Sequence, residues 1–440
     1  MSPMKIILLG YCGIILIGSL LLTLPVAARS MESTNFLDAF FTATSATCVT
    51  GLVRFDTYTH WSLFGQIVIL LMIQIGGIGF MTVAIWLASL TRMKIGLTTR
   101  FIMQSSIAAP QVGGMVRLTK FILIGTVIVE GCGAVLLCFH FCPDLGFLRG
   151  LWFSIFHSVS AFCNAGFDLM GYKAQFSSLT ASAGNWYVNI IIMLLIIIGG
   201  LGFLVWKDVI ASRFHFFKMK LHTKIVICMT LVLVFGGTVC IFLFELNGTV
   251  FDGKSLSDQA VGSLFQSVTA RTAGFNSLDI AKMTPSSQFL IVCLMMIGGS
   301  PGSTAGGVKT TTFAVLLLSI AATFRKRKHT EVYGRRLPEG ATRMASCVFM
   351  SYMFLSLSVS MIISNIEGTD FMSALFESVS AMGTVGLSMS LTPTLGIVSE
   401  LLLAFLMIIG RVGSITFLLA FSSGKGVIPS KLPAENIQIG

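Results

Sequence analysis

The sequence has few charged residues. Only 11% of its 440 residues are Asp, Glu, Lys or Arg, whereas soluble globular proteins have roughly 25%. Hydrophobic residues make up 55% of the chain, and the mean hydropathy is +0.89. This balance excludes an ordinary soluble globular protein, and it predicts a polytopic helical membrane protein built as one bundle.

The sequence also lacks the residue patterns of a metal centre or an enzyme. Its ten cysteines form no Cys-x-x-C pair and no Cys/His arrangement with ligand spacing. Most of them lie in apolar runs, where they serve as small hydrophobic residues. The apolar runs hold no paired catalytic groups, only isolated Glu130 and Arg411 and scattered hydroxyls. We therefore expect no enzyme and no bound cofactor, and an intramembrane enzyme stays as a remote alternative.

Nucleotide and nucleic-acid binding are disfavoured as well. Gly302 and Gly307 have the spacing of a phosphate-binding loop, but Val308 separates Gly307 from Lys309 and no strand precedes the loop. The net charge of +11 does not indicate nucleic-acid binding, because the basic residues concentrate in alternate loops.

Eight apolar runs are long enough to span a membrane, since about 20 residues cross the hydrocarbon core. The first run resembles a signal peptide, but its apolar part is too long for one, so we expect a retained first helix. The runs cover residues 5–27, 61–90, 118–141, 186–211, 222–246, 287–322, 341–365 and 395–423.

The chain repeats itself four times. Between the members of each pair of runs lies a short segment of mixed polarity that starts with Phe, contains a Ser/Thr-Ala step and ends in Gly. The second run of each pair carries a Gly-Gly motif, with Gly-Arg in the last pair. The short segments are 41–51, 156–166, 265–274 and 376–386, and the third is one residue shorter. The fold class predicted is an all-α polytopic membrane protein of four pseudo-symmetric helix, re-entrant pore loop, helix repeats around a central pore. Their boundaries are 1–100, 101–215, 216–330 and 331–440.

Basic residues predict the orientation. Most of the 29 Lys and Arg residues fall in the loops between repeats and in the two tails, whereas the acids gather on the side of the re-entrant segments. By the positive-inside rule, both termini are cytoplasmic.

Four re-entrant loops around one axis would present backbone carbonyls to an ion. Glycine tolerates positive φ, so carbonyls can turn toward the axis, and a carbonyl ring replaces the hydration shell of an ion. The half-helices would point their negative C-terminal ends at this site, which favours a cation.

The run of 287–322 is interrupted by a polar, glycine-rich stretch at 298–309 that includes Pro301. Broken backbone at membrane depth persists only where it is buried in protein or lines a water-filled cavity. This stretch is therefore a second candidate for the ion pathway.

These features together resemble one family. The four loops ending Thr-Gly51, Ala-Gly166, Ala-Gly274 and Val-Gly386, the stretch 298–309, and the segment 270–276 resemble the membrane subunit of Ktr-type potassium uptake systems, within the Trk/Ktr/HKT superfamily. The resemblance covers nearly the whole chain. It implies that potassium is the substrate and that Gly51 favours potassium over sodium.

The resemblance also implies site residues. The predicted selectivity filter comprises Thr47, Cys48, Val49, Thr50, Gly51, Cys163, Asn164, Ala165, Gly166, Thr272, Ala273, Gly274, Gly383, Thr384, Val385 and Gly386. The predicted gate comprises Gly298, Gly299, Ser300, Pro301, Gly302, Ser303, Thr304, Ala305, Gly306, Gly307, Lys309 and Arg411. A charge at the bilayer centre is costly, so we expect Arg411 to face the bundle interior and contact the gate loop.

For other polar residues the sequence predicts less specific roles. Arg271 would brace its loop or tune the outer mouth, and Glu130 would make a packing hydrogen bond rather than relay protons. Asp168, Asp279 and Asp370 would attract cations to the mouth or remain ordinary loop charges. We expect no ion-binding role for Thr42, His157 and Glu377, which occupy matching positions in their half-helices. The basic run 325–329 would fix topology and would also dock an acidic partner surface or anionic lipid.

The family resemblance implies a homodimer in the plasma membrane. It also implies a cytosolic ring of RCK-type regulatory subunits that bind ATP and ADP. Membrane lipid is a further expected partner, and nucleic acid is not. A sodium-carrying or proton-coupled transporter remains open as the alternative function, with sodium as a coupling or activating ion.

Overall fold

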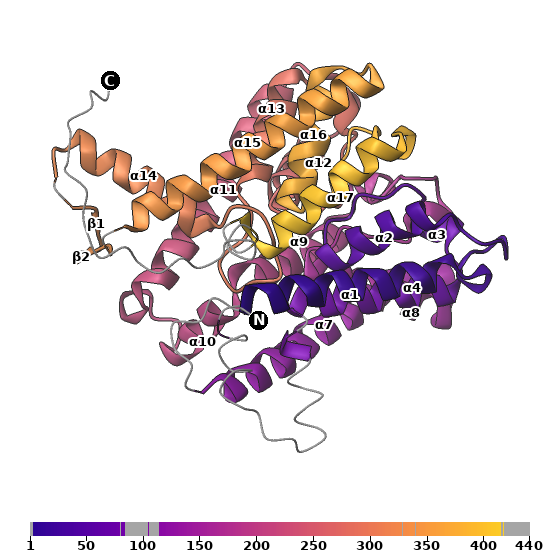
Figure 1. Ribbon diagram of the computed structural model, residues 1–440, viewed down its shortest axis with the longest axis horizontal. Helices are drawn as coiled ribbons and strands as arrows, with labels where there is room; N and C mark the ends of the chain where they lie inside the picture. The colour runs from indigo at the N-terminus through magenta and orange to yellow at the C-terminus, as the bar shows by residue number, and fades with distance from the viewer. Residues whose placement is uncertain are drawn as a thin grey trace.

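The computed structural model describes residues 3–79, 81–83, 104, 114–327, 329–338, 340–414 and 417. In this part of the chain the structure is mostly helical, with one short hairpin (Figure 1). The principal elements are α1 (Pro3–Thr23), α2 (Phe36–Cys48), α3 (Thr57–His60), α4 (Leu63–Ile78), α7 (Met115–Leu145), α8 (Phe147–Cys163), α9 (Trp186–Leu201), α10 (Phe203–Ala211), α11 (Leu221–Glu245), α12 (Leu256–Thr269), α13 (Pro285–Met296), α14 (Thr310–Phe324), β1 (Glu331–Val332), β2 (Arg335–Arg336), α15 (Ala341–Glu367), α16 (Phe371–Gly383) and α17 (Ile397–Val412).

Four helices, α1, α7, α11 and α15, are each long and apolar enough to cross a membrane. Large hydrophobic side chains point outward from them, with Val127 67%, Phe139 72% and Phe235 60% exposed. Such a surface is costly in water and is satisfied by lipid tails. These helices match the first apolar run of each predicted repeat.

Each long helix packs against a shorter helix that follows it, in the pairs α1–α2, α7–α8, α11–α12 and α15–α16. The shorter helices carry the mixed-polarity segments and are the predicted half-helices. Side chains cap several of their N-termini: Asn35 accepts from the Leu37 amide, and Asp370 accepts from the Met372 amide. The helical pattern is therefore the one predicted, while the exact repeat boundaries stay a prediction.

Within the described residues, the second apolar run of each predicted repeat is broken and not one continuous helix; residues 84–90 and 418–423 of two of these runs lie outside the described part. α9 and α10 meet at Gly202 with a bend of 92°. Gly79 follows the last residue of α4 and Gly413 follows the last residue of α17, and all three glycines have positive φ, between 89° and 96°. Positive φ is accessible to glycine and breaks a right-handed helix. The last glycine of each motif therefore interrupts the helix, as the loop 298–309 does between α13 and α14.

The buried core runs through all four helix groups. Aromatic side chains of the half-helices fill its centre, including Phe41, Phe156, Phe265 and Phe376, each at most 1% exposed. These are the four phenylalanines that open the repeated segments. Figure 1 shows α14 and the β1–β2 hairpin at the end of the bundle opposite α3. The core thus holds the four half-helix ends at fixed positions inside the bundle.

Candidate ion pathway

Four backbone turns of the same kind follow the half-helices. Val49, Asn164, Thr272 and Thr384 adopt left-handed conformations with φ between 52° and 71°. Two residues further on, glycines 51, 166, 274 and 386 also have positive φ, at 94°, 69°, 81° and 91°. Non-glycine residues rarely adopt positive φ. The same left-handed conformation at four matching positions is therefore a specific feature of these loops. We call these four glycines the glycine ring.

The glycine ring is closed. At each glycine, an added side-chain carbon would meet the carbonyl oxygen of the residue that precedes the glycine of the next repeat, at 2.5 Å for Gly51, 2.8 Å for Gly166 and 2.5 Å for Gly274. The contacts proceed in one direction and return to the first loop. The four pairs are Gly51 with Ala165, Gly166 with Ala273, Gly274 with Val385, and Gly386 with Thr50. Four loops therefore surround one axis at backbone contact, which leaves no room for side chains.

A hydroxyl supports each loop from behind. Ser45 and Ser380 accept hydrogen bonds of 3.0 Å from the amides of Gly51 and Gly386. In the other two repeats the equivalent hydroxyls donate to the carbonyl after the glycine, from Ser160 to Phe167 at 2.6 Å and from Thr269 to Phe275 at 2.7 Å. The Ser/Thr of the repeated Ser/Thr-Ala step thus fixes each loop against its half-helix.

The third loop differs because it is one residue shorter. Its half-helix ends on Ala270 in the right-handed conformation, whereas α2, α8 and α16 end on left-handed residues. Arg271 is buried, and its Nη2 lies 3.5 Å from the Thr230 hydroxyl. With Thr230, Gly200 and Gly299 it lines a small space behind the loop. Its side chain therefore lies behind the ring and does not line the cavity described next, and a role of Arg271 in bracing the loop or tuning the mouth stays a prediction.

An outer cavity of about 310 Å³ opens above the glycine ring, and all four ring glycines line it. Two carboxylates line it as well, the buried Asp56 and the partly buried Asp168. Asp279 instead pairs with Lys282 at 3.1 Å, and Asp370 caps α16. Of the three acids predicted at the mouth, Asp168 alone lies there. Asp56 was missed, because nothing in the sequence shows that the turn before α3 folds over the ring.

Backbone amides hold both mouth carboxylates. Asp56 accepts from the amides of Thr59 at 2.9 Å and Phe176 at 3.0 Å, so it joins the first loop region to the second. Asp168 accepts from the Met170 amide at 2.9 Å. Burial raises the pKa of the Asp168 carboxyl to about 6; the Met170 amide opposes this shift and the Asp56 charge adds to it.

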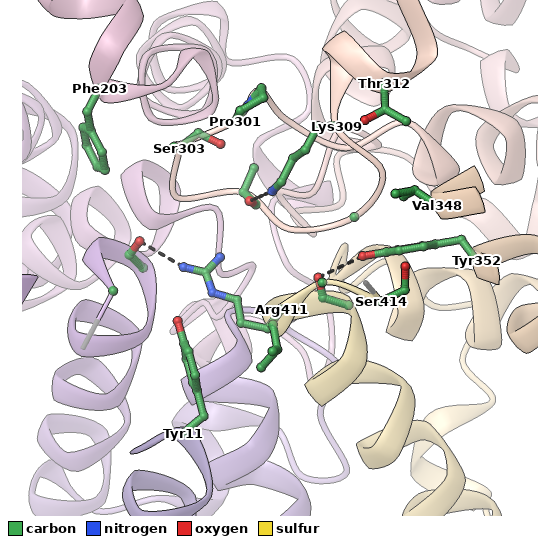
Figure 2. A pocket seen from close by; sticks show the side chains of 18 of the residues that line it. Tyr11, Phe203, Pro301, Ser303, Lys309, Thr312, Val348, Tyr352, Arg411 and Ser414 are labelled. Carbon is green, nitrogen blue, oxygen red and sulfur yellow. Dashed lines mark hydrogen bonds between the residues drawn. The ribbon is translucent and has the colours of Figure 1, made fainter. Parts of the chain in front are cut away.

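An inner cavity of about 280 Å³ lies on the other side of the ring. Residues of the loop 298–309, called the intramembrane loop from here on, form one wall. The ends of α4 and α17 form much of the rest. Figure 2 shows the side chains of Lys309 and Arg411 pointing into this cavity.

The intramembrane loop packs directly beneath the glycine ring. The Thr304 hydroxyl donates to the Phe162 carbonyl at the end of α8, at 3.0 Å. A side chain at Gly306 would collide with the Thr384 hydroxyl, and one at Gly307 would lie 3.0 Å from the Gly383 carbonyl oxygen. The loop therefore touches the inner ends of the second and fourth ring loops.

Hydrogen bonds close the intramembrane loop on itself and tie it to α9. The Gly298 amide donates to the Val308 carbonyl at 2.8 Å, so the two ends of the loop meet. The Ser300 amide donates to the Gly200 carbonyl at 3.0 Å, and the Phe203 amide of α10 donates to the Gly302 carbonyl at 2.8 Å. These backbone groups of the broken helix are thereby satisfied inside the bundle, as membrane depth requires.

Arg411 ties the intramembrane loop to α4. Its guanidinium donates to the carbonyl of Thr304 in the loop and to the carbonyls of Gly76 and Gly77, the last at 3.0 Å. The Lys309 ammonium folds back onto the loop and donates to the Ala305 carbonyl at 2.7 Å. The positively charged side chains of Arg411 and Lys309 therefore donate hydrogen bonds to backbone carbonyls on the inner side of the ring. Both side chains face the inner cavity.

Two side chains brace the loops in ways that the sequence did not reveal. Glu377 accepts from the hydroxyls of Ser388 at 2.5 Å and Thr392 at 2.7 Å, and so holds the segment after Gly386. His157 accepts from the Leu169 amide at 3.3 Å in the second repeat. Both residues directly follow the repeated Phe, and this shared position is the sequence feature that could have indicated a common bracing role. Glu130 accepts from the Gln74 amide at 2.9 Å, a hydrogen bond between α7 and α4 as expected.

The geometry defines a class of protein: a polytopic helical membrane protein whose four related loops meet on one axis between two cavities. Residues 14–427 match the sequence model of the TrkH family, described as a cation transport protein. The chain belongs to this Trk/Ktr family of membrane transporters.

Individual relatives agree with this assignment. The chain is 40% identical to the potassium/sodium uptake protein NtpJ of Enterococcus hirae, over 100% of this chain and 98% of that protein. It is 37% identical to the Ktr system potassium uptake protein B of Bacillus subtilis, over 96% of this chain and 93% of the relative. The crystal structure of the potassium transporter TrkH from Vibrio parahaemolyticus superimposes with a TM-score of 0.74, at 19% identity, over 96% of this chain and 85% of that one. That structural likeness shows the fold.

Proposed function

We propose that this chain takes up potassium across the plasma membrane and that the glycine ring is its selectivity filter. The closed ring of four backbone loops between two cavities carries this proposal. A cation sheds its hydration shell only where many oxygens replace the water, and four loops that approach within backbone contact supply them. The potassium uptake proteins among the relatives support the same ion.

In this proposal the intramembrane loop is the gate. It lies beneath the ring, and Arg411 and Lys309 hold it with hydrogen bonds to backbone carbonyls. Two positive charges in the inner cavity oppose a cation that leaves the ring. Opening requires the loop to withdraw and the charges to move off the axis.

Regulation and assembly follow the Ktr relatives. We propose a homodimer with cytoplasmic termini that binds a cytosolic ring of RCK-type, ATP- and ADP-responsive subunits. Relatives described as Ktr system proteins B and D support this assembly, because a system implies further subunits. The chain itself needs no cofactor in this scheme.

Sodium transport is the second candidate. One observation favours it: the relative NtpJ is described as a potassium/sodium uptake protein. Gly51 argues for potassium, because the family resemblance implies that glycine at this position favours potassium over sodium. The chemistry proposed for the ring is the same in both cases, so only the preferred ion differs. Enzyme function is disfavoured because these relatives are transporters.

Cation flux into liposomes separates these candidates. We expect the purified chain to pass potassium and rubidium faster than sodium, and Gly51→Ser to reduce that preference. A serine side chain at φ 94° would also press on the Ala165 carbonyl. Equal sodium and potassium flux in the unmodified chain would favour the second candidate, and no flux of either ion would refute both.

The mouth carboxylate Asp168 predicts a pH dependence of uptake. With a pKa of about 6, it is negatively charged at pH 7.5 and neutral at pH 5, so the mouth attracts cations less strongly at low pH. One unit charge nearby in water is worth about 1 kcal/mol, which corresponds to about a fivefold rise in the KM for potassium. Measuring KM at both pH values tests this.

Two variants serve as references for the pH experiment. Asp168→Asn should show the high KM at both pH values. Asp279→Asn removes an exposed carboxylate that pairs with Lys282 outside the cavity, and it should keep the pH dependence of the unmodified chain. A KM that changes equally in Asp168→Asn would assign the titration to another group.

A further inference from the structure

The segment 203–220, called the surface segment below, leaves the bundle at a right angle. α10 turns away from α9 by 92° at Gly202. A side chain at Gly202 would lie 2.7 Å from the Pro301 carbonyl oxygen, so glycine is required there. A helix perpendicular to a spanning helix runs parallel to the membrane plane, and the exposed basic side chains of the segment favour the membrane surface over the hydrocarbon core, where charges are costly. Figure 1 shows α10 at the edge of the bundle, on the side away from α3.

The surface segment exposes both apolar and basic side chains. Phe214 and Phe217 are 78% and 90% exposed, and Ile210 is 58% exposed. Four basic residues, Lys207, Arg213, Lys218 and Lys220, are exposed too. None of the four forms an ion pair within the described residues.

The single acidic residue of the surface segment, Asp208, already accepts hydrogen bonds within the protein. Asp208 accepts from the Lys220 amide at 2.9 Å and from the Thr223 hydroxyl at 2.6 Å, and thereby fastens the segment to the start of α11. The positive charge of the segment is therefore not neutralised from within. A helix that lies in the interface with apolar residues and Lys/Arg side by side is the pattern of an anchor in anionic lipid.

We propose that the surface segment binds anionic phospholipid headgroups and that this lipid acts on the intramembrane loop. The effect on the intramembrane loop rests on the proposed function, whereas the binding of lipid does not. The edge of an anionic bilayer takes up the exposed rings of Phe214 and Phe217 and satisfies the basic side chains at the same time. The bilayer is therefore the occupant that the chemistry favours.

Two contacts connect the surface segment to the loop and the ring. The first residue of α10, Phe203, donates its amide to the Gly302 carbonyl of the intramembrane loop at 2.8 Å. The Trp206 ring lies 5.7 Å from the ring of Phe162, whose carbonyl holds the Thr304 hydroxyl of the same loop. A lipid that fixes α10 at the interface thus fixes one edge of the loop.

The binding half is tested with the full chain in nanodiscs of phosphatidylcholine containing labelled phosphatidylglycerol. We expect the chain to retain phosphatidylglycerol after detergent extraction. A variant with Lys207, Arg213, Lys218 and Lys220 changed to Gln should retain about tenfold less, since each basic residue near the surface contributes to anionic lipid binding. The matched control changes Arg149, Lys173, Lys254 and Lys282 to Gln, which removes the same charge from the side of the re-entrant segments, away from the surface segment. Equal loss in both variants, or no preference over phosphatidylcholine, would overturn the proposal.

The coupling half is tested by two variants at one position. Phe203→Pro removes the amide that donates to Gly302, and proline is tolerated at the first position of a helix. Phe203→Ala keeps this amide and loses only the ring. We expect potassium flux to depend on phosphatidylglycerol content in the unmodified chain and in Phe203→Ala. In Phe203→Pro, lipid retention should persist while this dependence is lost.

The outcomes separate the two proposals. Flux that ignores phosphatidylglycerol while the lipid is retained would overturn the coupling. Absence of flux in every lipid would refute the proposed function, while lipid retention would still decide the binding half.

Discussion

We expect potassium uptake to fall steeply when Gly386 is replaced by alanine. This residue has φ 91°, and an added methyl group would collide with the Thr50 carbonyl oxygen across the ring and lie 2.9 Å from the Gly51 Cα. The left-handed conformation costs alanine roughly 1–2 kcal/mol, and overpacking adds about 1–3 kcal/mol. Because the ring cannot expand at one point without opening elsewhere, we expect flux into liposomes to fall by more than about tenfold.

A second glycine isolates the effect of the ring. Gly340 also has positive φ, 86°, but an added methyl group there would meet nothing within 4 Å. Gly340→Ala therefore carries the conformational cost alone, and we expect it to keep normal flux. If both variants lost uptake equally, backbone strain and not closure of the ring would be responsible.

Replacing Arg411 by glutamine raises the flux. The guanidinium holds the intramembrane loop through Thr304 and bridges it to the carbonyls of Gly76 and Gly77. Hydrogen bonds to a charged group contribute about 1.5–3 kcal/mol each, so the loss of two or three of them favours the open loop by at least about a hundredfold. The same substitution removes a positive charge from the inner cavity. We expect a large rise in flux without added regulatory subunits.

The control for Arg411 removes a basic residue of the same type elsewhere. Arg343 is exposed near the start of α15, and Arg343→Gln should leave flux unchanged. Unchanged flux in Arg411→Gln, with normal assembly and thermal stability, would show that the loop does not hold the pathway closed through this contact.

The sequence predicted the parts of the fold that depend on hydrophobicity and repetition. The long helices α1, α7, α11 and α15, the four half-helices and the ring glycines all follow from run length and from the repeated Phe…Gly segments. The breaks at Gly79, Gly202 and Gly413 were missed, since one glycine in an apolar run does not reveal its φ.

Side-chain placement at the candidate site was harder to predict. Arg411 was expected to contact the intramembrane loop, because a buried charge needs partners and a broken helix offers free carbonyls. The mouth position of Asp56 and the bracing role of Glu377 depend on how loops fold over the ring, which no local pattern encodes. Arg271 was given two roles from its place in the chain alone, and its side chain turned out to lie behind the ring.

The most direct test of the account is to locate the ion. Crystals grown in rubidium, with data collected at its absorption edge, report rubidium positions by anomalous scattering. The account predicts a peak on the axis enclosed by Gly51, Gly166, Gly274 and Gly386. A well-ordered ring without such a peak, with rubidium bound elsewhere in the bundle, would contradict the claim that these glycines form the selectivity filter.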